Sequence, residues 1–278
     1  QAFGASDQQE TARLLARSCG VALSAAFILI LMQQPIEKIS FALIQPTSDI
    51  EALSSHYFRI CIWGAPAVLG LYSLSGWFIG MQDSVSAMAA DITVNGMNVL
   101  MSIILTLGFS IGGWHYEGIG FSGVAAGTVC AQYSGLLVAV ILLLAKYRRN
   151  TLRTIRLSEL KGIFKGDQMR SFMSMNADLF VRSLCFIAIY IGFTVISARY
   201  GDTLLAVSSI LMKLLMIFSY FTDGFAYAGE AMTGKYIGAK DEVMLRQTVK
   251  WTFIWSMGIA LIFIGIYHFA GVPLLRMM

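Results

Sequence analysis

A stripe of four polar side chains runs through one long apolar stretch of the sequence: Asp91, Asn95, Asn98 and Ser102. Spacings of four, three and four residues place them on one face of a helix. One interpretation is hydrogen bonding to a neighbouring helix, with Asp91 reaching toward the membrane boundary. The other is a polar cavity wall, because ionisable residues inside an apolar span are costly and usually face water or a site.

A second stretch carries charges of both signs, together with an amide: Asn176, Asp178 and Arg182. Asp178 and Arg182 are four residues apart, so an ion pair on one helical face is possible and would lower the cost of placing both in a membrane. The pair is interpreted either as a structural clamp or as part of an ion- or substrate-linked site.

Three more charged residues occupy the following apolar stretch: Lys213, Asp223 and Glu230. Asp223 and Glu230 are seven residues apart and share a face, whereas Lys213 lies on another. Glu230 is near the end of its stretch, where water could solvate it, and Asp223 lies deeper. Elsewhere, Thr128, Gln132 and Tyr133 form a weaker polar patch that packing would also explain.

The sequence has no nucleophile elbow, phosphate-binding loop, dinucleotide-binding glycine pattern or zinc motif. Its four cysteines lie one per apolar stretch, without the spacing of metal ligands. We therefore expect no catalytic residues, no metal, no cofactor and no enzyme activity.

The composition of the chain indicates which structural elements hold these residues in place. The chain is 57% hydrophobic and 13% charged, with a mean hydropathy of +0.69, whereas soluble domains are roughly 25% charged. Runs of about 20 apolar residues are long enough to cross a bilayer, where only helices or closed barrels satisfy the backbone. We predict an all-α polytopic membrane protein, embedded in a lipid bilayer and without a nucleic-acid partner. Its seven spans are expected near 17–36, 57–80, 85–110, 119–145, 172–198, 203–233 and 248–270.

Basic residues are concentrated between positions 146 and 170, which hold eight Lys and Arg against two acidic residues. This segment is predicted to be a linker between two domains, 1–145 and 171–278. Basic loops favour the cytoplasmic side of a membrane. Residue 1 and the linker are therefore expected inside, and residue 278 outside.

A short motif occurs twice, at 1–7 and at 235–241. The identical positions are Gly4, Ala5 and Asp7 in the first copy and Gly238, Ala239 and Asp241 in the second. Six apolar stretches separate the copies, and an even number returns the chain to the same side of a membrane. The motif therefore predicts a parallel internal repeat, with its axis along the membrane normal.

Several blocks resemble the multidrug and toxic compound extrusion family of transporters, and most closely its DNA-damage-inducible F branch. The loop after the family's second helix is similar to 1–5, its fourth helix to 57–67 and 75–82, its seventh to 176–182, and its eighth, with the following loop, to 223–238. The resemblance implies two six-helix lobes, of which this chain would hold helices three to nine, truncated at both ends. The N-lobe would be 1–145 and the C-lobe 171–278.

The same resemblance implies a monomeric antiporter of the inner (plasma) membrane that exports organic cations and other drugs in exchange for H⁺ or Na⁺. Three departures from the family pattern stand out. The family's first two helices, which carry a carboxylate central to ion coupling, would not be in this chain. Ser102 stands where the family often has Asp, and 119–145 holds no acid. A flippase for a lipid-linked precursor is the alternative. A seven-helix receptor or retinal protein is disfavoured by the expected inside N-terminus, and an intramembrane enzyme by the absence of a catalytic pair.

Overall fold

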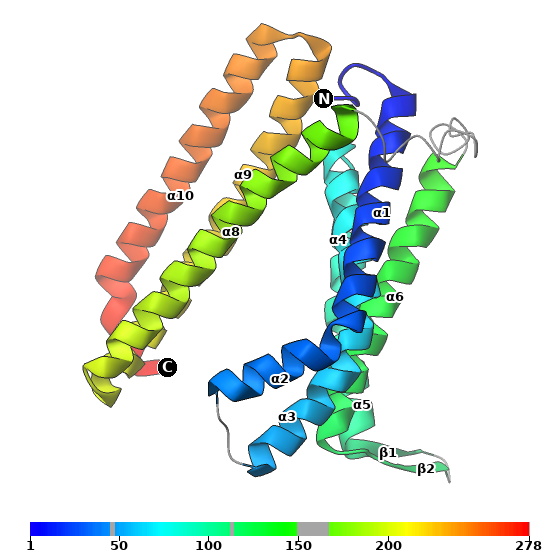
Figure 1. The fold of residues 1–278 in the computed structure, drawn as a ribbon. Coiled ribbons are helices and arrows are strands. Elements are labelled where there is room, and N and C mark those ends of the chain that lie inside the picture. The colour runs from blue at the N-terminus through cyan, green and yellow to red at the C-terminus, as the bar shows by residue number, and fades with distance from the viewer. Residues whose placement is uncertain (45–47, 112–113, 149–166, 278) are drawn as a thin grey trace. The chain divides into compact units, whose positions relative to one another are not determined.

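The structure is a computed structural model that describes residues 1–44, 48–111, 114–148 and 167–277 (Figure 1). Within these residues, seven helical stretches are long and apolar enough to cross a membrane, which confirms the predicted number. They are Gln8–Leu31, Ile50–Gly80, Ser84–Leu107, Phe121–Tyr147, Met169–Arg199, Thr203–Ala239 and Glu242–Phe269.

The chain divides into two compact units. The N-terminal unit contains Ser6–Leu160 and Ala2, and the C-terminal unit contains Lys161–Met278 together with Gln1 and Phe3–Ala5. Most of the predicted basic linker, 149–166, lies outside the described residues.

Four helices form the bundle of the N-terminal unit: α1 (Gln8–Leu31), α4 (Ala65–Gly80), α5 (Ser84–Leu107) and α6 (Phe121–Tyr147). Their shared core holds aliphatic side chains and an aromatic group in which the rings of Trp77 and Tyr147 meet edge to face, 4.9 Å apart. Trp77 Nε1 also donates to the carbonyl of Thr11, 3.0 Å away. This bond ties α4 to the first turn of α1.

Small residues allow α5 and α6 to approach closely. Every fourth residue along one face of α6 is small and buried: Gly123, Gly127, Ala131, Gly135 and Ala139. A Cβ added at Gly127 would lie 2.6 Å from the Ser102 amide nitrogen, so α5 tolerates only glycine at this point. Such spacing is typical of helices that pack in membranes, where backbone proximity replaces the hydrophobic effect.

Between α1 and α4 the chain departs from the predicted span boundaries. Helix α1 ends at Leu31, and Pro35 lies in the first turn of a separate helix, α2 (Gln33–Ile44). The first span therefore ends before the predicted 36, and Pro35 does not end a helix, because proline is tolerated in a first helical turn.

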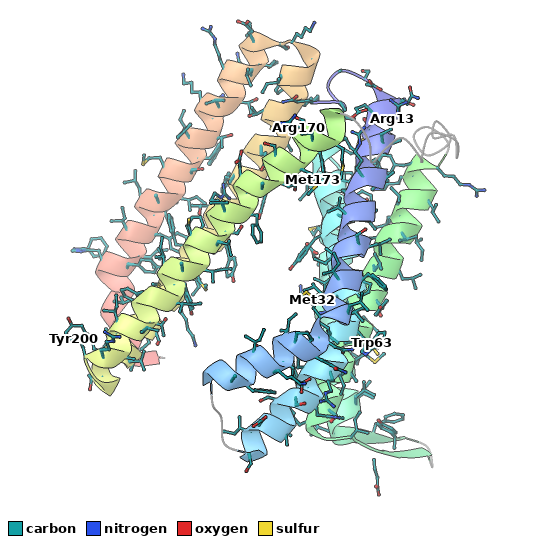
Figure 2. All side chains as sticks on the ribbon, viewed as in Figure 1. Arg13, Met32, Trp63, Arg170, Met173 and Tyr200 are labelled. Atoms are coloured by element: carbon teal, nitrogen blue, oxygen red, sulfur yellow. The ribbon has the colours of Figure 1, made fainter. Side chains whose placement is uncertain are left out.

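The second span is interrupted where the sequence places Pro66. Helix α3 (Ser48–Cys61) leads into a short 3₁₀ turn, η1 (Ile62–Gly64), and α4 follows with proline in its first turn. From α6, the Tyr133 hydroxyl donates to the Trp63 carbonyl at 2.9 Å; Trp63 is labelled in Figure 2. Another helix thus supplies a donor at an irregular turn, as a backbone carbonyl inside a membrane requires.

One small β-hairpin interrupts this otherwise helical fold. Helix α5 ends at Leu107, not near 110, because Gly108 takes a φ of +76° that starts a strand. Strands β1 (Gly108–Ile111) and β2 (Trp114–Glu117) are antiparallel, with Gly108 opposite Glu117. The rings of Phe109 and Tyr116 face each other at 6.0 Å across this pair.

The C-terminal unit is a row of three long helices: α8 (Asp167–Arg199), α9 (Asp202–Ala239) and α10 (Glu242–Met277). Helix α9 packs against both others (Figure 1). Between α9 and α10 the contact is aromatic, with the Phe218 and Phe263 rings 5.5 Å apart, and the Tyr267 hydroxyl donates to the Leu214 carbonyl at 2.7 Å.

Candidate functional site

The structure brings three of the predicted polar residues together where α5 packs on α6. Asn98 Oδ1 accepts hydrogen bonds from Ser102 Oγ at 3.0 Å and from Thr128 Oγ1 at 3.3 Å. All three side chains are half-buried. The amide of Asn98 thus links two membrane-spanning helices through its oxygen.

Gln132 extends this polar cluster by one turn of α6. Its Oε1 is buried, packs on Gly64 of η1, and has no hydrogen-bond partner among the described residues. Leaving a buried acceptor unpaired costs about 1–3 kcal/mol. We use the name amide cluster for Asn98, Ser102, Thr128 and Gln132.

Asp91 and Asn95 do not join the amide cluster. The face that α5 turns toward α6 includes Ala90, Val94 and Ser102, the first two beside Gly135 and the third beside Gly127. Asp91 and Asn95 lie one position beyond this face, and both are exposed. Asn95 Nδ2 donates instead to the Asp91 carbonyl of its own helix, at 2.9 Å.

A second polar group, which sequence reasoning missed, surrounds Asp83 between α4 and α5. Its carboxylate accepts from Lys146 Nζ at 3.0 and 2.9 Å, from Ser86 Oγ at 2.6 Å and from the Tyr147 hydroxyl at 3.0 Å. Burial disfavours its ionised form, but the bonds from Ser86, Lys146 and Tyr147 outweigh burial and hold the pKa of Asp83 below its ordinary value. The sequence signal that could have identified Asp83 is its position directly before a predicted helix, since this residue caps α5.

In the C-terminal unit, the charged candidates remain apart. Asp178 and Arg182 are both exposed on α8, and no ion pair joins them among the described residues. The predicted pair is therefore absent: a separation of four residues allows contact but does not impose it. Asn176 Nδ2 donates to the Phe172 carbonyl of its own helix at 2.7 Å. Lys213, Asp223 and Glu230 are likewise exposed along α9.

The two copies of the repeated motif contact each other within the C-terminal unit. Gly4 packs on the backbone of Lys235, the first residue of the second copy. Gly238 packs on the backbone of Gln1, the first residue of the first copy. A side chain at either glycine would collide with that backbone. Both copies therefore require a glycine at the same position of the motif.

The described residues hold no group of three or more His, Cys, Asp or Glu that could bind a metal ion. The amide cluster instead offers uncharged oxygens from amides and hydroxyls. Hard monovalent or divalent cations prefer such ligands.

Comparisons with known proteins agree with the membrane fold. The MatE family model matches residues 1–104 and 179–278. DNA damage-inducible protein F of Escherichia coli (strain K12) is 30% identical over 271 residues, which cover 98% of this chain and 56% of that protein. Probable multidrug resistance protein NorM of Photorhabdus laumondii is 26% identical, over 75% of this chain and 44% of its own length. A crystal structure of MATE in complex with MaD3S superposes with a TM-score of 0.76 at 18% identity, over 99% of this chain and 60% of the solved one.

Proposed function

The chain belongs to the MatE family, whose members are membrane transporters and not enzymes, and from this premise we propose that it acts in a secondary multidrug antiporter. It spans about half the length of the curated relatives it matches. The proposed transporter exports organic cations and other toxic compounds in exchange for H⁺ or Na⁺. Family membership also argues against the receptor and intramembrane-enzyme alternatives.

The amide cluster is the observation that carries the coupling proposal. It places the acceptor oxygens of Asn98 and Gln132, one of them unpaired, between helices that cross the membrane. Polar groups at such positions are costly and usually mark an ion or substrate pathway. A cation that binds there in one conformation supplies the missing partner and favours that conformation by its difference in affinity.

The two coupling ions make different demands on the site. Amide and hydroxyl oxygens can bind Na⁺ directly, whereas none of the four side chains of the amide cluster titrates near neutral pH. Coupling to H⁺ would therefore need a carboxylate. Among the predicted site residues, the carboxylates in spanning helices are Asp91, Asp178, Asp223 and Glu230.

We place the protein in the plasma membrane as a multi-pass monomer, with residue 1 and the segment 146–170 in the cytoplasm. Cysteine labelling in intact cells tests this orientation. Positions in 37–56 should react with an impermeant reagent, and positions in 146–170 should react only after the membrane is permeabilised. The reverse pattern would contradict the orientation.

Drug accumulation tests the transport proposal itself. Cells that lack their own efflux pumps and express the full-length protein should retain less of a fluorescent organic cation than cells with an empty vector. Collapse of the H⁺ and Na⁺ gradients should abolish the difference. Equal retention at verified expression in the membrane would reject drug efflux as the function.

A further inference from the structure

The helices α2 and α3 line an open pocket of about 680 Å³ in the N-terminal unit. Helix α2 contributes Glu37, Lys38 and Phe41 to its lining, and α3 contributes Glu51 and Arg59. None of these residues belongs to the amide cluster. The pocket therefore calls for an explanation separate from transport.

An ion pair in the lining of the pocket joins the two helices. Arg59 Nε and Nη2 each donate to the Glu37 carboxylate at 3.2 Å, and Ser55 also donates to it. The bonds from Ser55 and Arg59 lower the pKa of Glu37, so this carboxylate stays ionised. The remaining guanidinium donors of Arg59 are free for an anion, because its side chain is 65% exposed.

Two charges in the lining lie outside the Glu37–Arg59 pair, although the charge of Lys38 also acts on Glu37. Lys38 and Glu51 make no hydrogen bond or ion pair among the described residues. The pocket thus offers a cationic group (Lys38, with the open edge of Arg59) and an anionic one (Glu51). Its four charged side chains sum to zero, which favours a ligand that carries one charge of each sign.

The surroundings of the pocket are those of a membrane interface. Helix α2 has only 12 residues, too few to cross a bilayer, and lies between two spanning stretches. Apolar side chains on the same two helices are exposed: Ile39, Ile50 and Leu53 are 61%, 57% and 52% accessible. Phe41 adds an apolar wall within the pocket. A ligand held here would have a polar head and an apolar remainder.

We propose that this pocket binds the phosphoethanolamine headgroup of a bilayer phospholipid. The phosphate accepts hydrogen bonds from Lys38 and Arg59, the ammonium group pairs with Glu51, and the acyl chains leave along the apolar surface of α2 and α3. A bidentate guanidinium and a point-charge ammonium are the donors that phosphate sites in proteins commonly use. The site does not depend on what the transporter carries.

Native mass spectrometry of the full-length protein in detergent provides the test, with phosphatidylethanolamine and phosphatidylglycerol as competing probes. Lys38→Gln should weaken binding of both lipids at least tenfold. Glu51→Gln should weaken phosphatidylethanolamine by a similar factor and shift the preference toward phosphatidylglycerol, because the pocket then carries a net positive charge. Both variants leave the Glu37–Arg59 pair intact, so α2 and α3 should keep their fold.

Lys250→Gln and Glu242→Gln, at exposed positions of α10, are the matched controls and should leave the lipid preference unchanged. Soluble glycerophosphoethanolamine distinguishes a lipid from a free zwitterion, and it should not displace the lipid at equal concentration. Unchanged preference in Glu51→Gln, or full displacement by the soluble headgroup, would overturn the proposal.

Discussion

Ser6 and Lys240 hold the same left-handed backbone conformation, with φ of 57° and 56°, at equivalent positions of the repeated motif. Each precedes an aspartate that caps a helix: Asp7 accepts from the Glu10 amide at 2.9 Å and Asp241 from the Met244 amide at 3.0 Å. The two copies of the motif therefore share a backbone conformation and a helix cap, and not only identical residues.

The same turn occurs a third time, between α4 and α5. Gln82 has a φ of 59°, and Asp83 again follows as the cap. The Asp83 amide donates to the Phe78 carbonyl at 2.8 Å, as the Asp241 amide does to Tyr236 at 3.0 Å. This six-to-one hydrogen bond is the signature of a helix that ends in a Schellman turn.

The left-handed residue yields the first prediction. Lys240→Gly should stabilise the protein by about 1 kcal/mol, because a Cβ makes this conformation costly and glycine removes that cost. Lys240→Ala is the control, since it removes the charge but keeps the Cβ, and it should give no gain. Thermal unfolding in detergent measures both. Equal stability of the two variants would show that the backbone is not strained.

The second prediction concerns the ion pair between Asp83 and Lys146. Asp83→Asn keeps the helix cap, because Asn caps as well as Asp, but removes the charge. We expect the free energy of unfolding to fall by about 1 kcal/mol, which is the upper end of the range for exposed ion pairs. The lysine of this pair is 43% exposed. A double-mutant cycle with Lys146→Gln should recover most of this loss as coupling energy. Additive single effects would mean that the pair contributes nothing.

The pH dependence of stability that this pair causes follows from the direction of the pKa shift of Asp83. The pKa of Asp83 is lower in the folded protein than in the unfolded chain. Ionised Asp83 therefore contributes fully to the free energy of unfolding at a pH above its pKa in the unfolded chain, about 3.9. This contribution is lost as the pH falls through the pKa of Asp83 in the folded protein. Unfolding followed from pH 6 to pH 3 should show this acid loss in the unaltered protein and a smaller one in Asp83→Asn.

Sequence periodicity predicted the spans because a bilayer forces each one to be a long apolar helix. It also placed Asn98 and Ser102 on one face. It could not show that Thr128 of another helix meets them, because a helical face does not identify its neighbour. Asp83 and Lys146 are 63 residues apart, and no periodic signal connects positions so distant. The small residues of α6 were readable at every fourth position, but their partner helix was not.

The third prediction tests the donor that Tyr133 provides to the irregular turn before Pro66. Tyr133→Phe should cost about 0.6 kcal/mol, the average for hydrogen bonds between membrane helices, because the Trp63 carbonyl loses this donor. Tyr72→Phe is the control: this side chain is 70% exposed on α4, and its loss should be smaller. Equilibrium unfolding in mild detergent with added SDS compares them. A larger loss at Tyr72 would contradict the assignment.

The fourth prediction follows from the absence of an ion pair between Asp178 and Arg182. In a double-mutant cycle on stability with Asp178→Asn and Arg182→Gln, the coupling energy should stay below about 0.5 kcal/mol, as for residues that do not interact. Each single variant should still reduce drug efflux if the exposed charges face the transport pathway. A coupling of several kcal/mol would show that the pair forms in the membrane.

The last prediction separates helix packing from ion coupling in the amide cluster, with two asparagines of one helix as a matched pair. Asn98→Ala removes the oxygen that accepts from Ser102 and Thr128, whereas Asn95→Ala removes only a bond to its own backbone. Both should cost little stability, since a membrane hydrogen bond averages about 0.6 kcal/mol. Only Asn98→Ala should shift the dependence of efflux on pH or Na⁺, because a ligand moves an alternating-access equilibrium only through its difference in affinity between the two states. The measurement is efflux across a pH series, with and without Na⁺, at equal protein level. Identical curves for Asn98→Ala and the unaltered protein would leave this side chain with a packing role alone.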